Sequence, residues 1–381
     1  MEDEYVMKCG LYYLHLIGTN PFKRSIRGNI ICFIQTFTAI YSLGMAIDGV
    51  ISKYENIKSL AGSIDTVPSA IQTVIKLLSA IFLRQKMKNL YLMVEEKWPD
   101  DIFGREFQNK LNKWSKMFKT SYKVYLYFYV FTLVFFISRP LLRHSRILVT
   151  EWNLPCNVAS NQCYGFYVVL QASYFSIIVS VVFGFDIIFY AFLFYGFCEL
   201  EKIKYAFEHL SISENVEGDE EKVYVEFCKI LKHHDYILRF LDMVSKVYSL
   251  QLLSNFSAYV STIVFGVFFM NVDGFPPSKE NLAKYIPYLI THHFQLIMYC
   301  VLGEMIRTQL SSVSDTIYLS KWYVKKQPKL TKAMIIVMQM SRIPNKILIG
   351  GIWAMDLDLF MKVVKTSISV HAFMQTIYQV D

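Results

Sequence analysis

Apolar residues form seven long stretches along the chain, and charged residues collect between them. About 20 apolar residues in an α-helix cross the roughly 30 Å hydrocarbon core of a bilayer. The predicted spans are 29–47, 66–83, 125–142, 164–198, 247–272, 285–303 and a weaker last span from 347 onward. The fourth span is longer than a bilayer requires, so we expect it to tilt or protrude. The pattern predicts an all-α polytopic membrane protein with seven transmembrane helices.

The Lys and Arg residues are distributed unevenly between the two sides of the predicted spans. The segments before span one and after spans two, four and six hold 28 of the 39, whereas the alternate segments hold 7. Because cytoplasmic loops carry the excess of basic residues, the N-terminus is predicted to be cytoplasmic and the C-terminus extracellular. This topology is inverted relative to G-protein-coupled receptors. The chain also lacks their Asp-Arg-Tyr and Asn-Pro-x-x-Tyr motifs, which makes that class a weaker alternative.

The segments predicted to be cytoplasmic contain helical patterns of their own. In the long loop 199–246, Phe227, Ile230, Leu231 and His234 recur at i, i+3, i+4 and i+7. We therefore expect helices that continue below the membrane rather than flexible linkers. The predicted organisation is a cytoplasmic N-terminal segment 1–28, six transmembrane helices with their loops over 29–303, a cytoplasmic anchor segment 304–346 and a seventh helix in 347–381.

Composition narrows the functional class. Apolar residues make up 54% of the chain and charged residues only 18%, so an ordinary soluble enzyme is disfavoured. The net charge of +8 is explained by the basic loops, and no nucleic-acid partner is predicted. The histidine pairs at 233–234 and 292–293 are adjacent in sequence, so their rings diverge on a helix and do not suggest a metal site. No phosphate-binding loop or nucleophile motif is present, so neither enzymatic activity nor a cofactor is predicted, with an unrecognised membrane enzyme as a remote alternative.

The C-terminal third contains several short motifs in a recognisable order. They are YCVLGE at 299–304, SSVSDTIYLSKWY at 311–323, MQMSR at 338–342 followed by Pro344, and MDLDLF at 355–360. These motifs, with seven spans, inverted topology and this length, resemble the insect odorant receptor family. The loop 199–246 is short compared with that of the family's shared co-receptor, so the chain resembles an odorant-tuning member. A gustatory receptor of the same superfamily is the alternative, although the end of the chain departs from the gustatory pattern.

The resemblance implies an odorant-gated, non-selective cation channel in the plasma membrane of olfactory sensory neurons. It implies four subunits around one pore, with the shared co-receptor as partner in a heterotetramer, or four copies of one chain in a homotetramer. It also implies that the last helix lines the pore. Residues 366, 369, 370, 373, 376, 377 and 380 fall on one face of that helix. The candidate gate residues are Ser369, Phe373, Thr376 and Ile377.

A ligand pocket is expected in the outer halves of spans two, three, four and six, where the family binds its odorants. These half-spans are rich in apolar and aromatic side chains, which suit a small volatile molecule held by shape and dispersion. Only one of His292 and His293 can face such a pocket. The candidate ligand-binding residues are Ile71, Val74, Phe136, Tyr167, Leu170, Tyr174, Tyr288 and His292.

Two pairs of residues are candidates for direct contact in the folded chain, one as an ion pair and one as a disulfide. Asp186 and Lys76 lie in the inner halves of spans four and two, so they could pair within the membrane, or else each finds a separate partner. Cys156 and Cys163 share one extracellular loop and are a candidate disulfide, with free thiols as the alternative.

Overall fold

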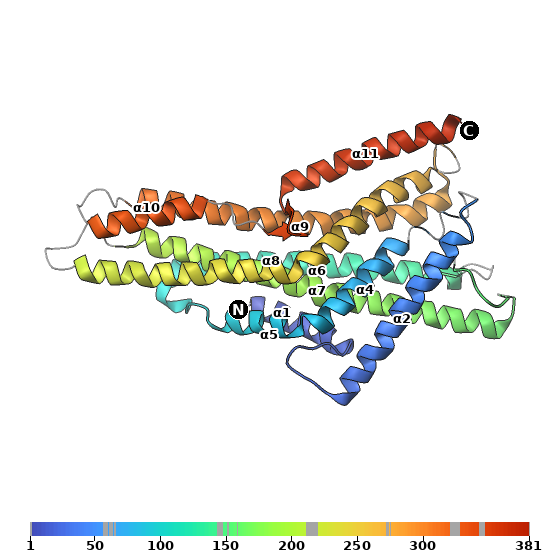
Figure 1. Ribbon diagram of the computed structural model, residues 1–381, viewed down its shortest axis with the longest axis horizontal. Coiled ribbons are helices and arrows are strands. Elements are labelled where there is room, and N and C mark those ends of the chain that lie inside the picture. The colour runs from blue at the N-terminus through green and yellow to red at the C-terminus, as the bar shows by residue number, and fades with distance from the viewer. Residues whose placement is uncertain are drawn as a thin grey trace.

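The computed structural model describes residues 2–55, 60, 64, 66–142, 148–150, 152–157, 159–210, 220–271, 274, 276–320, 328–342 and 347–380. The chain is a bundle of long helices with one small hairpin (Figure 1). The helices are α1 (Glu2–Leu16), α2 (Ile26–Ile51), α4 (Val67–Phe82), α5 (Arg84–Glu95), η1 (Asp101–Phe103), α6 (Gly104–Leu142), α7 (Asn161–Glu208), α8 (Glu220–Met270), α9 (Lys279–Leu319), α10 (Pro328–Arg342) and α11 (Leu357–Val380). The hairpin strands are β1 (Leu348–Ile349) and β2 (Trp353–Ala354).

Four helices are much longer than a bilayer is thick, and α6 is one of them with 39 residues. α7, α8 and α9 contain 48, 51 and 41 residues. At about 1.5 Å per residue they reach roughly 60–75 Å, about twice the hydrocarbon thickness. They pack on one another along much of this length (Figure 1). The helical extensions predicted within 199–246 and 304–346 are therefore present, with residues 211–219, 321–327 and 343–346 lying outside the described part.

Helix α7 forms the centre of the bundle. Its residues from Val181 to Ile203 are all buried. A helix that is apolar on every side must be surrounded by other elements, and here α1, α4, α6, α8 and α9 contact it. α1 approaches closely because Gly184 of α7 leaves room for Leu14.

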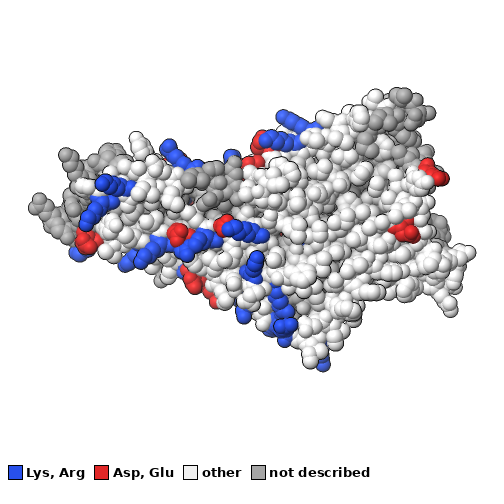
Figure 2. Space-filling model, in the orientation of Figure 1, with Lys and Arg blue, Asp and Glu red and all other residues white. Residues whose placement is uncertain are grey.

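The molecule carries a broad uncharged surface beside a charged one. Figure 2 shows Lys and Arg gathered over the half that contains α10, while the half that contains α2 is almost free of charge on this face. Large apolar side chains point outward there, including Phe33 and Phe37 of α2 and Tyr127 and Phe131 of α6. Of the described helices, α2, α7, α8 and α9 are long and apolar enough to cross a membrane, and the α4–α5 pair, bent by 72°, supplies a fifth. α6 and α11 coincide with the remaining predicted spans.

Beyond the uncharged half, the long helices form a stem that is joined by buried polar contacts. The Glu199 carboxylate, 1% exposed, accepts from Nζ of Lys202 at 2.7 Å and from Nε2 of His233 at 2.8 Å. The Trp98 ring stacks on His233 with centroids 4.0 Å apart. These contacts bind the segment between α5 and α6 to both α7 and α8.

A second stem contact involves Glu201, which accepts from Lys110 at 2.9 Å and Lys204 at 3.0 Å. Burial alone would raise the pKa of this carboxyl, but the two lysines outweigh burial and hold its pKa below the usual value.

The last span begins later than the sequence predicts. Residues 348–354 form the β hairpin, and α11 starts at Leu357. The prediction that the helix occupies 347 onward is wrong over these ten residues. Gly350 and Gly351 adopt positive φ angles of 60° and 75°, which a helix cannot contain and which glycine tolerates best. Asp358 and Lys362 of α11 form an ion pair at 2.6 Å.

Candidate ligand-binding cavity

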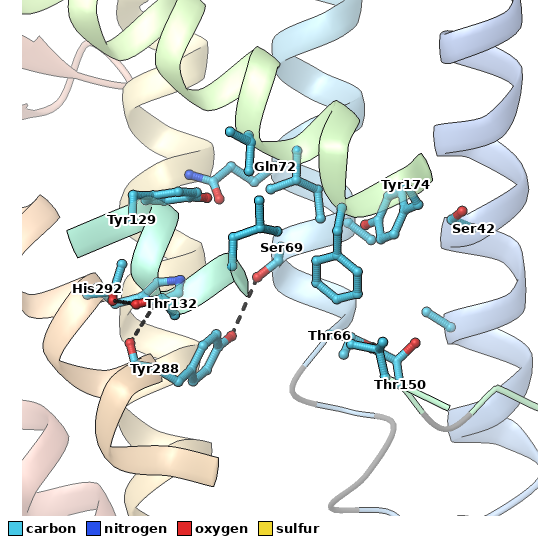
Figure 3. A pocket seen from close by; sticks show the side chains of 18 of the residues that line it. Ser42, Thr66, Ser69, Gln72, Tyr129, Thr132, Thr150, Tyr174, Tyr288 and His292 are labelled. Atoms are coloured by element: carbon cyan, nitrogen blue, oxygen red, sulfur yellow. Dashed lines mark hydrogen bonds between the residues drawn. The ribbon is translucent and has the colours of Figure 1, made fainter. Parts of the chain in front are cut away.

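A cavity of about 120 Å³ lies within the uncharged half of the bundle. Its wall is mainly apolar and aromatic and comes from α2, α4, α6, α7, α9 and the loop that precedes α7 (Figure 3). The lining residues are Ser42, Ala46, Thr66, Ser69, Ala70, Gln72, Tyr129, Thr132, Leu133, Val149, Thr150, Trp152, Tyr174, Phe175, Ile178, Val179, Tyr285, Tyr288, Thr291 and His292. Its volume is of the order that encloses a benzene-sized molecule.

The polar groups of the cavity gather on α4, α6 and α9. The hydroxyls of Thr132 and Thr291 lie 2.8 Å apart, and the Tyr288 hydroxyl lies 3.4 Å from that of Ser69. The His292 ring packs on Tyr288 with centroids 4.4 Å apart. Figure 3 shows these groups facing Tyr174 and Ser42 across the cavity. The arrangement can hold a mostly apolar molecule by its shape and orient it through a few polar contacts.

The end of the cavity farther from the stem is covered by a loop, here called the cap loop, whose described residues are 148–150 and 152–157. Gln171 of α7, fully buried, binds it through four contacts. Its Oε1 accepts from the backbone N–H of Val149 and Thr150 at 2.9 and 3.2 Å, and its Nε2 donates to the carbonyl and hydroxyl of Thr150, both at 2.9 Å. This bonding holds Thr150 and Trp152 against the cavity.

Two further contacts fix the same loop. Nδ2 of Asn153 donates to Asp48 at 2.9 Å and to Ser52 at 3.0 Å on α2. Cys156 and Cys163 are joined by a disulfide with Cα atoms 6.2 Å apart. The cap loop is therefore attached to both α2 and α7.

We expect Gln171→Met to loosen the cap loop without unfolding the bundle. Methionine has a similar length but makes none of the four hydrogen bonds, and each buried backbone group left unpaired costs about 1–3 kcal/mol. A bound ligand should leave faster and its half-maximal concentration should rise about tenfold or more, with the maximal response retained. Response decay after ligand removal measures this. Ser173→Ala, which removes an exposed hydroxyl bonded only to its own helix at Val169, is the matched control. Equal decay in both variants would contradict the assignment.

The inner end of the cavity rests on a buried ionic network. Nζ of Lys76 on α4 lies 2.7 Å from Oδ1 of Asp186 on α7, and these side chains are 0% and 1% exposed. Oδ2 of Asp186 accepts from the Tyr125 hydroxyl of α6 at 3.1 Å and from Nε2 of Gln295 on α9 at 2.6 Å. The predicted Lys76–Asp186 pair is confirmed. The network joins the four helices, about one turn beyond the cavity residues of α4, α6 and α9 and two turns beyond those of α7.

A comparison with known families identifies the molecule. Residues 56–368 match the family model described as 7tm Odorant receptor. This chain belongs to that family. Two curated relatives of the receptor come from Drosophila melanogaster. Odorant receptor 67c is 27% identical over 162 residues, and Odorant receptor 85b is 29% identical over 125 residues. The matched segments span 42% and 33% of this receptor and only 39% and 31% of those relatives.

The fold of the receptor matches a solved structure along nearly its whole length. The insect olfactory receptor OR5 from Machilis hrabei, determined in complex with eugenol, superposes with a TM-score of 0.86 over 97% of both chains. A second structure of the same Machilis hrabei receptor superposes with a TM-score of 0.84 over 96% of both chains. The two sequences are only 14% identical, so this likeness establishes a shared fold. The predicted class, an all-α protein with seven membrane helices, is confirmed, and the receptor's relatives are not enzymes.

Three of the eight predicted ligand-binding residues of the receptor, Tyr174, Tyr288 and His292, line the cavity. Tyr167 and Leu170 instead pack behind the cavity, with the Tyr167 ring 6.5 Å from that of Trp152. Ile71 is 42% exposed on the outside of α4, and Val74 packs into the main core. None of these four side chains lines the cavity. Ile71 points away from the lining face of α4, whereas Tyr167 and Leu170 share the α7 face of Tyr174 but lie two turns and one turn nearer the start of the helix. The Phe136 side chain lies outside the described residues.

Sequence reasoning missed the contributions of α2 and of the cap loop. The receptor uses Ser42 and Ala46 of the first predicted span and Thr150 and Trp152 of a connecting segment. A signal existed for Trp152, since a large aromatic residue close to a candidate disulfide is rarely left in water. The polar residues of the cavity, such as Thr132, gave no signal because Ser and Thr also occur at ordinary helix interfaces.

The predicted gate residues of the receptor lie on the outer part of α11. The first half of this helix packs on α8 and α9, where Leu359, Val363 and Ser367 are buried. Farther along, Ser369, Phe373 and Thr376 are exposed, and Figure 1 shows α11 running apart from the bundle toward the C-terminus. The Ile377 side chain lies outside the described residues. Among those described, the three gate candidates share an exposed face that no element of this chain covers.

Proposed function

We propose that this odorant receptor is a subunit of an odorant-gated, non-selective cation channel in the plasma membrane of olfactory sensory neurons. The observation that carries the proposal is the pairing of a small, capped, mainly apolar cavity with a terminal helix whose far half is uncovered. The cavity would bind the odorant. The uncovered face of α11 would meet the same helix of neighbouring subunits around a common pore.

The proposed assembly is a tetramer, with the shared co-receptor as partner in a heterotetramer or with four copies of this chain. Apolar side chains exposed on α10 and around the hairpin support assembly, because Ile336, Ile352 and Trp353 are 56%, 69% and 44% exposed outside the uncharged half. The proposed orientation places the N-terminus in the cytoplasm and rests on the uneven basic residues. Terminal tags on intact cells test it, and an accessible N-terminal tag would refute it.

The test of the channel is to express the receptor with and without the co-receptor and to record current over a chemically varied odorant panel. We expect a fast cation current that needs no G protein or added nucleotide. A response that depends on nucleotide would favour a coupled receptor instead. Surface labelling of the same cells separates a silent channel from one that never reaches the membrane.

Phe373→Ser should raise the current recorded without odorant several-fold. An apolar ring keeps a pore closed because water confined there lacks hydrogen-bond partners, and a hydroxyl supplies them. Thr376→Asp should shift the reversal potential toward divalent cations by placing negative charge beside the ion path. Ile368→Ser is the matched control, since Ile368 is 63% exposed compared with 65% for Phe373 but lies on another face of α11. If all three variants behave alike at equal surface expression, α11 does not line the path as proposed.

A further inference from the structure

The two threonine hydroxyls on the polar side of the cavity have no hydrogen to spare. Thr291 donates to the Pro287 carbonyl at 2.8 Å, and Thr132 to the Phe128 carbonyl at 2.9 Å, while the two hydroxyls also lie 2.8 Å from each other. Each threonine has a single hydrogen, so the two hydrogens are fully used by these three contacts. Toward a ligand both threonines therefore offer lone pairs and no donor.

His292 presents an acceptor to the same side. Its Nδ1 lies 3.0 Å from the backbone carbonyl of Tyr288, which can only accept, so Nδ1 carries the hydrogen. An unpaired charge is costly in an apolar wall, and none of the described lining residues is a carboxylate that could pair with an imidazolium. The ring is thus neutral, and its Nε2 is an acceptor without a hydrogen-bond partner among the residues that the structure describes. His292 and Thr132 lie next to each other in Figure 3.

We propose that this cavity selects small neutral alcohols and phenols, whose hydroxyl donates a hydrogen bond to Nε2 of His292 while the carbon skeleton fills the apolar remainder. The proposal rests on the proposed odorant-binding function and specifies its ligand. It excludes other classes for stated reasons. An ether or ketone has no hydrogen to donate to this side, a hydrocarbon leaves Nε2 unpaired, and an ammonium ion would be a charge without a counter-ion.

The opposite side of the cavity does not provide the same discrimination. The Ser42 hydroxyl has no hydrogen-bond partner among the described residues, and the Tyr174 hydroxyl lies near that of Thr73. Both can donate or accept, as can the hydroxyls of Ser69 and Tyr288. They can satisfy an ether oxygen as well as an alcohol oxygen. The preference for a donor is therefore assigned to the side formed by His292, Thr132 and Thr291.

The test compares phenol, benzyl alcohol and 1-hexanol, each with its own methyl ether. Binding to the purified full-length receptor is measured by the shift in Tm with ligand concentration, and activation by current in cells. Each alcohol should bind about tenfold more tightly than its ether, the usual effect of one hydrogen bond. His292→Phe keeps an aromatic ring but removes Nε2 and should bring the alcohol-to-ether ratio close to one.

His293→Phe is the matched control. His293 makes the same backbone contact, Nδ1 to the Leu289 carbonyl at 2.8 Å, but does not line the cavity, so the ratio should stay near tenfold. A wild-type ratio near one, an equal loss in both histidine variants, or no Tm shift with any of the three alcohols would overturn the inference. Alcohol-selective binding without current would refute the proposed channel only. Odorant-evoked current without alcohol preference would refute this inference only.

Discussion

Asp186→Asn is expected to destabilise the receptor by about 3–5 kcal/mol and to keep most of it from the cell surface. The substitution leaves the Lys76 ammonium with 0% exposure and no counter-ion, and breaking one side of a buried pair carries that cost. Lys76→Met should have a similar effect, since it leaves the buried Asp186 carboxylate without a counter-ion. Surface labelling and thermal unfolding of the purified protein measure both.

The double variant Lys76→Met with Asp186→Asn provides the decisive comparison. The asparagine carbonyl can still accept from Tyr125 and Gln295, and no charge remains in the membrane. We expect this variant to recover most of the stability lost in either single variant, with a coupling energy of about 3 kcal/mol between the two positions. Additive losses would mean that the two groups act separately despite their 2.7 Å contact.

Gly303→Ala is expected to abolish odorant-evoked current. A Cβ at this position of α9 would overlap the carbonyl oxygen of Met355 and come within 3.1 Å of its Cε. The backbone of Met355 cannot move freely, because its N–H donates to the Ile347 carbonyl at 2.9 Å and α11 begins two residues later. Overpacking against fixed backbone costs about 1–3 kcal/mol or more. The strain falls where the proposed pore helix joins the bundle.

Alanine substitutions at two other glycines serve as controls, because they show whether an effect comes from the clash with Met355 or from alanine in general. Gly44→Ala on α2 meets no atom within 4 Å and should be neutral or slightly stabilising, because alanine favours a helix. Gly196→Ala would crowd the end of the Leu241 side chain at 2.8 Å and touch that of Ile306 at 3.6 Å, with no backbone atom among these nearest contacts, and should cost less than Gly303→Ala. Current at matched surface expression and Tm would rank the three. Equal behaviour of Gly44→Ala and Gly303→Ala would show that the close approach to Met355 is unimportant.

The lengths of the apolar stretches were sufficient to predict the membrane helices of this receptor. The charged residues within them also predicted one long-range contact, between Lys76 and Asp186. An ionisable residue in an apolar span needs a partner, and Lys76 and Asp186 were the two available at matching depth. The hairpin before α11 was missed because its strands have only two residues each and lie beside apolar sequence. Its only clear mark was the Gly350-Gly351 pair, which is a turn signal in the middle of an expected helix.

The region of the cavity could be inferred from the sequence, but the particular lining side chains could not. The expected half-spans include Tyr174, Tyr288 and His292, yet neighbours such as Ile71 turned out to face outward. Helix rotation depends on packing between helices, and periodicity cannot resolve it where a span is apolar on all sides. The role of Gln171 in holding the cap loop could not be predicted either, because no pattern in the sequence associates this residue with that loop.

The Lys76–Asp186 pair also imposes an order on biosynthesis. The two residues are separated by 110 positions, so α4 enters the membrane well before its counter-ion has been translated. At about 5–20 residues per second, the nascent chain holds an unneutralised lysine for roughly 5–20 s. A lysine in mid-membrane costs about 3 kcal/mol at the translocon, enough to keep α4 loosely inserted or associated with the insertion machinery. We therefore expect the N-terminal third to settle in the bilayer only after the fourth span arrives, so that release of α4 from the translocon waits for Asp186.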